Sequence, residues 1–124
     1  MGIMNLFKKK PQKTLLDEVQ DSTVKLFRAI GEANAIAPTY NMSDKLILRI
    51  AEEVMSAFKD AAQIKGERIP GGYLMSIAMK FFSVHEQFGE LFYKKHLEYE
   101  IQNYHLNGLR EDYKFNLLNQ GENE

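Results

Sequence analysis

The segment Tyr73–Val84, YLMSIAMKFFSV, decides the fold of this chain. Nine of its twelve residues are apolar or aromatic, and only two serines and one lysine interrupt them. It directly follows a Pro-Gly-Gly turn at 70–72 and runs without proline or glycine as far as Gly89. A helix that is apolar on nearly all sides has to be covered on most of them. We therefore expect this segment to be the buried centre of the fold.

The composition is that of an ordinary globular domain. The chain has 124 residues, 44% of them hydrophobic and 27% charged, which fits a single domain. It has no cysteine, which excludes disulfides, thiolate metal sites and a cysteine nucleophile. The 16 basic and 17 acidic residues give a net charge of −1, so the basic footprint of a nucleic-acid-binding protein is missing.

Nothing in the sequence indicates a membrane protein. Lys80 and Glu86 interrupt the most apolar stretch before it reaches the length of a membrane-spanning helix. The apolar residues 1–7 are too few for a secretory signal, and the lysines follow them instead of preceding them. Gly2 is placed for myristoylation, but Leu6 occupies the position that requires serine or threonine. We expect a cytoplasmic protein without a membrane partner.

Two amphipathic helices are predicted before the central segment. The first runs from about Thr14 to about Asn34, with Thr14 as N-cap and Asp17 three residues later as in a capping box. The second begins after Ser43, a good N-cap, and ends at Lys65-Gly66, where a last-turn cation precedes a glycine.

The third helix starts near Tyr73 and continues to Asn107, where Asn107-Gly108 forms a stop. A helix of that length spans roughly 50 Å at 1.5 Å per residue, so it either bends near Gly89 or projects from the body. Leu109–Leu118 predicts a short fourth helix, and no segment shows strand periodicity. The expected fold is all-α: three main helices and a short C-terminal one.

The predicted domain organisation is simple. Residues 14–118 form one helical domain. Residues 1–13, with the lysine run Lys8–Lys10, form a flexible basic tail to which no role is assigned, and residues 119–124 form a disordered tail.

The second half of the third helix is the best candidate for an interface. Aromatic side chains are enriched in interface cores because they bury large areas at low entropic cost. So long a helix carries more apolar residues than two neighbours can cover. The predicted interface consists of Phe88, Phe92, Tyr93, Leu97, Tyr99, Ile101 and Tyr104.

A ligand pocket is the alternative. It would lie between the second and third helices, lined by Phe58, Met75, Met79 and Phe82. A weaker variant makes His85 and Glu86 metal ligands, but a metal site needs three or four ligands from more than one element, and no such motif is present. No nucleophile elbow or other catalytic motif occurs either.

The sequence therefore favours a non-enzymatic helical protein that acts through protein–protein interaction, without a cofactor. We expect it to form a homo-oligomer, with a dimer favoured, and to regulate a protein partner.

Overall fold

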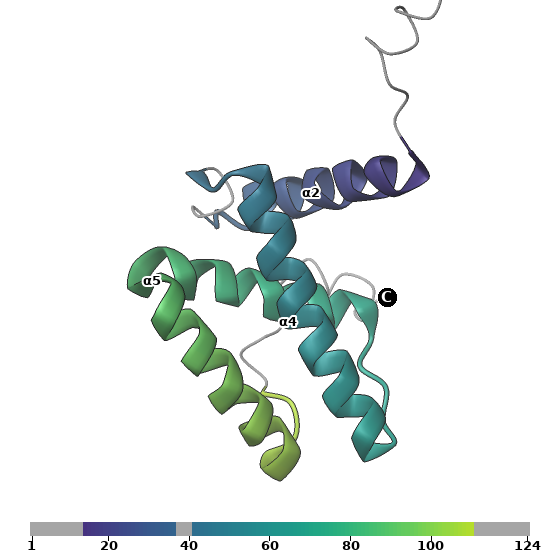
Figure 1. Ribbon diagram of the computed structural model, residues 1–124, viewed down its shortest axis with the longest axis vertical. Helices are drawn as coiled ribbons and strands as arrows, with labels where there is room; N and C mark the ends of the chain where they lie inside the picture. The colour runs from purple at the N-terminus through teal and green to yellow at the C-terminus, as the bar shows by residue number, and fades with distance from the viewer. Residues whose placement is uncertain (1–13, 37–40, 111–124) are drawn as a thin grey trace, which may run out of the picture.

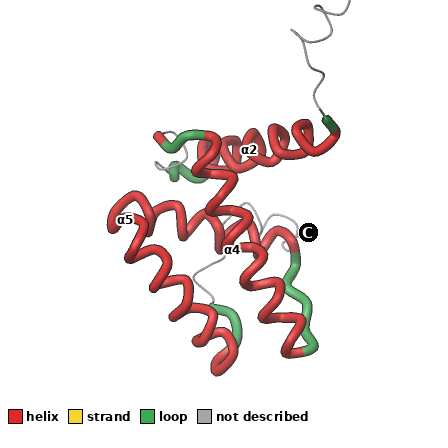
Figure 2. Tube along the Cα trace, in the orientation of Figure 1, coloured by secondary structure: helices red, strands yellow, loops and turns green. Residues whose placement is uncertain are grey.

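The computed structural model describes residues 14–36 and 41–110 (Figure 1; Figure 2). Three helices make up this part of the chain: α2 (Leu15–Ala33), α4 (Asp44–Lys65) and α5 (Gly71–Asn107). The described residues contain no strand, which confirms the all-α class. Residues 108–110 are not helical, and the rest of the expected fourth helix lies outside the described residues, as do the tails 1–13 and 119–124.

The predicted helix ends are confirmed in α2 and α4. The Thr14 hydroxyl accepts a hydrogen bond from the Asp17 amide at 3.0 Å, and the Asp17 carboxylate accepts one from the Thr14 amide at 3.2 Å. This is a complete capping box. At α4, the Ser43 hydroxyl accepts from the Leu46 amide, and Gly66 ends the helix in the left-handed conformation.

Helix α5 bends sharply at Gly89. It begins at Gly71, two residues before the predicted start, and its backbone leaves helical geometry at Gly89, where φ is 89° and ψ is 178°. Only glycine adopts this conformation without strain, because it has no Cβ. The bend divides α5 into a first arm, residues 71–88, and a second arm, residues 90–107. In Figure 1 the first arm crosses behind α4, and the second arm turns back beside α4.

The first arm lies at the centre of the fold, as predicted. No residue of Tyr73–Val84 is exposed, and Ile77, Phe81 and Phe82 are at most 1% exposed. The Phe82 ring meets the Phe27 ring of α2 edge-on at 5.4 Å between centroids, and Phe81 meets Phe58 of α4 at 6.5 Å. The first arm therefore joins the other two helices through aromatic contacts.

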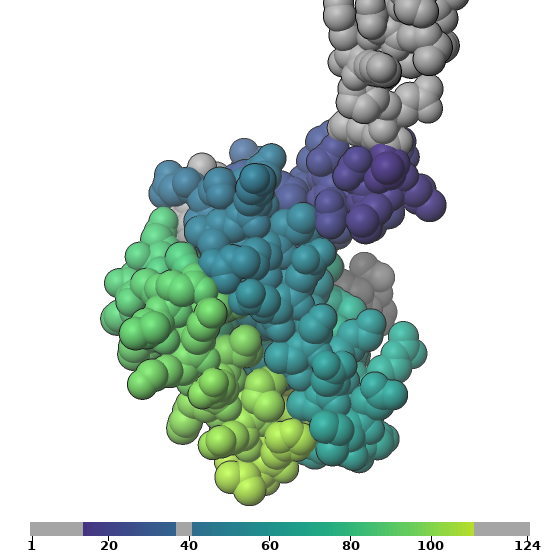
Figure 3. All heavy atoms as spheres, viewed as in Figure 1, coloured from purple at the N-terminus to yellow at the C-terminus, as the bar shows by residue number. Residues whose placement is uncertain are grey.

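Helix α2 is only half covered. Its buried residues, Val24, Phe27, Ile30 and Gly31, all belong to its second half. The first half extends away from the body of the molecule, as the purple end in Figure 3 shows. This arrangement leaves apolar side chains of α2 in solvent.

Candidate interaction surface

Ion pairs attach the start of the second arm to α4. The Arg49 guanidinium donates to both carboxylate oxygens of Glu90, at 2.7 and 3.0 Å, and also lies 3.3 Å from Glu53. The Tyr93 hydroxyl donates to Glu53 at 2.7 Å, and a ring nitrogen of His85 lies 2.8 Å from Glu90. Because Glu90 follows the bend directly, these bonds fix the direction of the second arm.

The same bonds set the protonation of this network. The hydrogen bond from Arg49 lowers the pKa of Glu90 to about 2, with a smaller contribution from His85. Burial raises the pKa of Tyr93 far above its ordinary value, and the hydrogen bond to Glu53 raises it further. At neutral pH Glu90 is therefore an anion and Tyr93 a neutral donor.

The far end of the second arm is attached in a similar way. The Tyr104 hydroxyl donates to Glu67 at 2.7 Å, while the Lys65 ammonium donates to the Tyr104 carbonyl at 2.9 Å. That ammonium also lies 4.3 Å from the centre of the Tyr104 ring. Burial and the Glu67 carboxylate raise the pKa of Tyr104 to about 12. The pairs from Arg49–Glu90 to Lys65–Tyr104 follow the same order along both helices, so the second arm runs parallel to α4.

The structure divides the predicted interface residues into two groups. Tyr93 and Tyr104 face α4 and are buried, at 0% and 2% exposure. Leu97 and Ile101 are half-buried and pack against the core. The exposed members are Phe88, Phe92 and Tyr99.

Three exposed rings and one half-buried ring, that of His96, form a continuous row, which we call the aromatic stripe: Phe88, Phe92, His96 and Tyr99. Ring centroids are 4.7 Å apart for Phe88 and Phe92, 5.9 Å for Phe92 and His96, and 6.3 Å for His96 and Tyr99. Leu91, 75% exposed, lies on the same helix three residues after Phe88. The sequence prediction omitted His96, although its spacing of four residues from Phe92 and three from Tyr99 signalled a shared face.

The alternative pocket residues are packed inside the protein. Phe58, Met79 and Phe82 are at most 1% exposed within the core, and Met75 is half-buried against it. A hollow of about 410 Å³ does lie between the end of α4 and the start of α5. Its walls are other residues: Lys59, Ala62, Gln63, Glu67, Arg68, Ile69, Gly71 and Leu74.

The acidic and histidine side chains are dispersed. In the described ranges no group of three or more histidine, aspartate or glutamate residues is placed to hold a metal ion. Of the two weakly predicted ligands, His85 is bonded to Glu90 and Glu86 is exposed. Glu100 is buried; one of its oxygens accepts from Arg110 at 2.9 Å, and the other has no hydrogen-bond partner.

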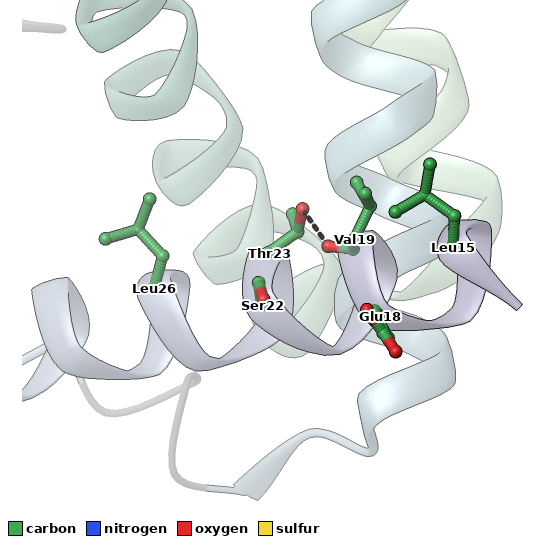
Figure 4. A pocket seen from close by; sticks show the side chains of 6 residues that line it. All are labelled: Leu15, Glu18, Val19, Ser22, Thr23 and Leu26. Atoms are coloured by element: carbon green, nitrogen blue, oxygen red, sulfur yellow. Dashed lines mark hydrogen bonds between the residues drawn. The ribbon is translucent and has the colours of Figure 1, made fainter. Parts of the chain in front are cut away.

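A second apolar surface lies on the exposed side of α2 (Figure 4). There, a hollow of about 350 Å³ is lined by Leu15, Glu18, Val19, Ser22, Thr23 and Leu26. All six residues belong to one helix, so the hollow has one wall and is open on the opposite side. The Thr23 hydroxyl donates to the Val19 carbonyl at 2.8 Å and is thereby satisfied within the helix.

Comparison with known proteins gives no family assignment. No protein-family model matches the sequence, and neither a curated protein nor a solved structure shows significant similarity to it. Separately, no helix within the described ranges combines the length and the apolar character that crossing a membrane requires. The function has to be argued from the residues themselves.

Proposed function

We propose that this protein is a non-enzymatic helical protein that acts through protein–protein interaction and self-associates through the aromatic stripe of α5. The observation that carries the proposal is the row of four contacting rings on α5, of which Phe88, Phe92 and Tyr99 are exposed and His96 is half-buried. Single exposed apolar side chains are normal, but contiguous ones mark interaction surfaces. Aromatic residues are also the type most enriched at interface centres.

The charges beside the stripe favour a second copy as its partner. Lys95 and Glu98 are exposed, have opposite charge and lie three residues apart on the second arm. In the described part of the chain neither of them has an ion pair. If two second arms pair antiparallel about a two-fold axis that passes between His96 and Leu97, Lys95 of each copy faces Glu98 of the other, and the symmetry forms this pair twice.

The titratable groups at the bend of α5 support a non-enzymatic role. His85, Glu90 and Tyr93 are bonded to protein groups, and none of them lines either hollow described above. Catalysis requires such groups within reach of a bound substrate. Their bonds instead support a structural role, which is to hold the second arm against α4 and keep the stripe outward.

The test is the solution mass, measured by light scattering on a sizing column over a dilution series. We expect a mass of at least twice the 14.4 kDa of one chain. Tyr99→Lys should halve it while the circular dichroism spectrum stays the same, because the 61% exposed Tyr99 ring contributes little to the core. Ser56→Lys places the same charge on an exposed position of α4 and is the matched control. A wild-type mass of 14.4 kDa at all concentrations would refute the proposal, as would an unchanged mass in Tyr99→Lys.

A further inference from the structure

Helix α2 carries a second apolar row that its own fold does not use. Its members follow one another in steps of four, three, four, three and four residues, and all are exposed: Leu15, Val19, Ser22, Leu26, Ala29 and Ala33. We call this row the α2 seam. A regular alternation of three and four residues is the 3.5-residue period by which one helix packs along another.

The seam is separate from the face that joins α2 to the core. That face is formed by Val24, Phe27, Ile30 and Gly31, whereas Leu15 is 77% and Leu26 is 50% exposed. A surface helix ordinarily has one apolar face and a polar face opposite. An apolar row with coiled-coil spacing, outside the core contact, indicates a second helix as the missing partner.

The charges along the seam identify that helix. Glu18, Lys25 and Glu32 follow one another at intervals of seven residues, so they form one edge of the seam. In the described ranges Glu18 and Lys25 have no ion pair. When two identical helices pair antiparallel with Ser22 at the centre, Glu18 of each copy comes within one residue, about 1.5 Å along the axis, of Lys25 of the other, which is within reach of an ion pair. The pattern is thus complementary to itself.

The side-chain sizes match the same register. With Ser22 facing its equivalent, Leu15 lies opposite Ala29 of the second copy, since both are seven residues from Ser22. Val19 and Leu26, three and four residues from Ser22, come within one residue of each other along the axis. One layer then combines a leucine with an alanine and the next a leucine with a valine, and the small central serine lets the two helices approach closely. Charge and shape therefore select one antiparallel arrangement.

We propose that α2 pairs with α2 of a second copy in an antiparallel contact about a two-fold axis next to Ser22. This contact is independent of the aromatic stripe, which lies on another helix. Two different two-fold contacts on one chain link copies into assemblies larger than a dimer, closed or open-ended. The inference therefore extends the proposed self-association from a dimer to a higher assembly.

Cysteine cross-linking in the full chain tests the contact, because the natural sequence contains no cysteine. The variants are made in the Tyr99→Lys background, so that the stripe cannot bring copies together. Ser22→Cys should give a disulfide-linked dimer on mild oxidation, since the two sulfur atoms meet near the axis. Leu15→Cys is the control: the two copies of residue 15 would lie about 21 Å apart along the axis, at 1.5 Å per residue, too far for a disulfide. Leu15→Cys combined with Ala29→Cys should cross-link again.

Charge reversal tests the register without cysteine. In the same background, Glu18→Lys should weaken the dimer about tenfold, because two exposed ion pairs become two repulsions. Adding Lys25→Glu should restore the affinity, since the pairs re-form with exchanged signs. Light scattering over a dilution series measures both effects.

Each outcome decides one of the two contacts. A dimer of the Tyr99→Lys protein that cross-links through Ser22→Cys supports the seam, whatever happens at the stripe. Cross-linking through Leu15→Cys as well as Ser22→Cys would overturn the antiparallel register. A Tyr99→Lys protein that stays monomeric and does not cross-link through Ser22→Cys would overturn the seam contact. The α2 seam would then be exposed to solvent or covered by another part of the same chain.

Discussion

Replacing Gly89 by alanine should destabilise the protein more than the same change at Gly66 or Gly71. At Gly89 φ is 89° and ψ is 178°, a region that is essentially restricted to glycine. A Cβ built at this position meets no atom within 4 Å. The cost of Gly89→Ala is therefore one of backbone conformation and not of crowding. We expect a loss of about 2 to 3 kcal/mol in the free energy of unfolding.

Two other glycines turn this prediction into a graded series. Gly66 has φ 74° and ψ 26°, which is the ordinary left-handed region. Gly71 is the first residue of α5, and its φ is not positive. Neither has an atom within 4 Å of an added Cβ. Gly66→Ala should cost about 1 kcal/mol, because a left-handed alanine is strained by 1–2 kcal/mol. Gly71→Ala should be neutral or stabilise by up to about 1 kcal/mol, because alanine loses less chain entropy on folding.

Urea denaturation followed by circular dichroism measures all three variants, with the solution mass recorded in parallel. The mass matters because Gly89→Ala also favours a straight α5, about 55 Å long by the helix rise, whose second arm can then pack on α4 of another copy. The expected order of stability is Gly71→Ala, then Gly66→Ala, then Gly89→Ala. If Gly89→Ala were as stable as Gly71→Ala at unchanged mass, the bend would not depend on glycine and the reasoning would be refuted.

Two further predictions concern the core and the ion pairs at the bend of α5. Phe81→Ala should cost about 3 to 5 kcal/mol in the free energy of unfolding measured in urea, because the ring is 1% exposed and its removal leaves a cavity in the core. A loss under about 1 kcal/mol would place Phe81 outside the core. Glu90→Gln should change the acid stability. The folded pKa of about 2 lies below the unfolded value, so the stabilisation by Glu90 is complete above about pH 4.5 and is lost as the pH falls towards 2. At 39% side-chain exposure we expect at most about 1 kcal/mol from this pair. The difference between wild type and variant in thermal scans should shrink from pH 6 to pH 2, and a constant difference would contradict the assignment.

The sequence predicted the helices better than it predicted their partners. Thr14, Asp17, Ser43 and Gly66 are local signals, since each acts on backbone within one helical turn, and the structure confirms all four. The bend at Gly89 remained one of two possibilities, because an isolated glycine is compatible with a continuous helix. The decision comes from Arg49 and Glu90, 41 residues apart in the sequence, whose ion pair forms only when the arm turns back.

The predicted interface in α5 shows the same limit: the sequence does not reveal which face of the helix packs against a partner element. Tyr93 and Tyr104 are eleven residues apart, about three helical turns, and so share the face that meets α4. Phe92 and Tyr99 share the outer face. Periodicity alone divides the second arm into these two faces, but both are apolar and aromatic, so it does not indicate which is buried. Glu53 and Glu67 decide it, because they accept hydrogen bonds from Tyr93 and Tyr104.

The exposed apolar residues argue most strongly for association, because of where they lie. Ten large hydrophobic side chains of the described residues are exposed. Three of them, Leu15, Val19 and Leu26, belong to the α2 seam, and four, Phe88, Leu91, Phe92 and Tyr99, lie on or beside the aromatic stripe. Single exposed apolar side chains would need no explanation. These seven lie in two rows, and each row is a contiguous apolar surface that a partner could cover as a whole. Burying one such side chain contributes roughly 1.5 to 3 kcal/mol, so the rows hold the largest unused source of stabilisation in this fold. Because no residue of Tyr73–Val84 is exposed, the two rows are the apolar surfaces that α2 and α5 offer to another chain.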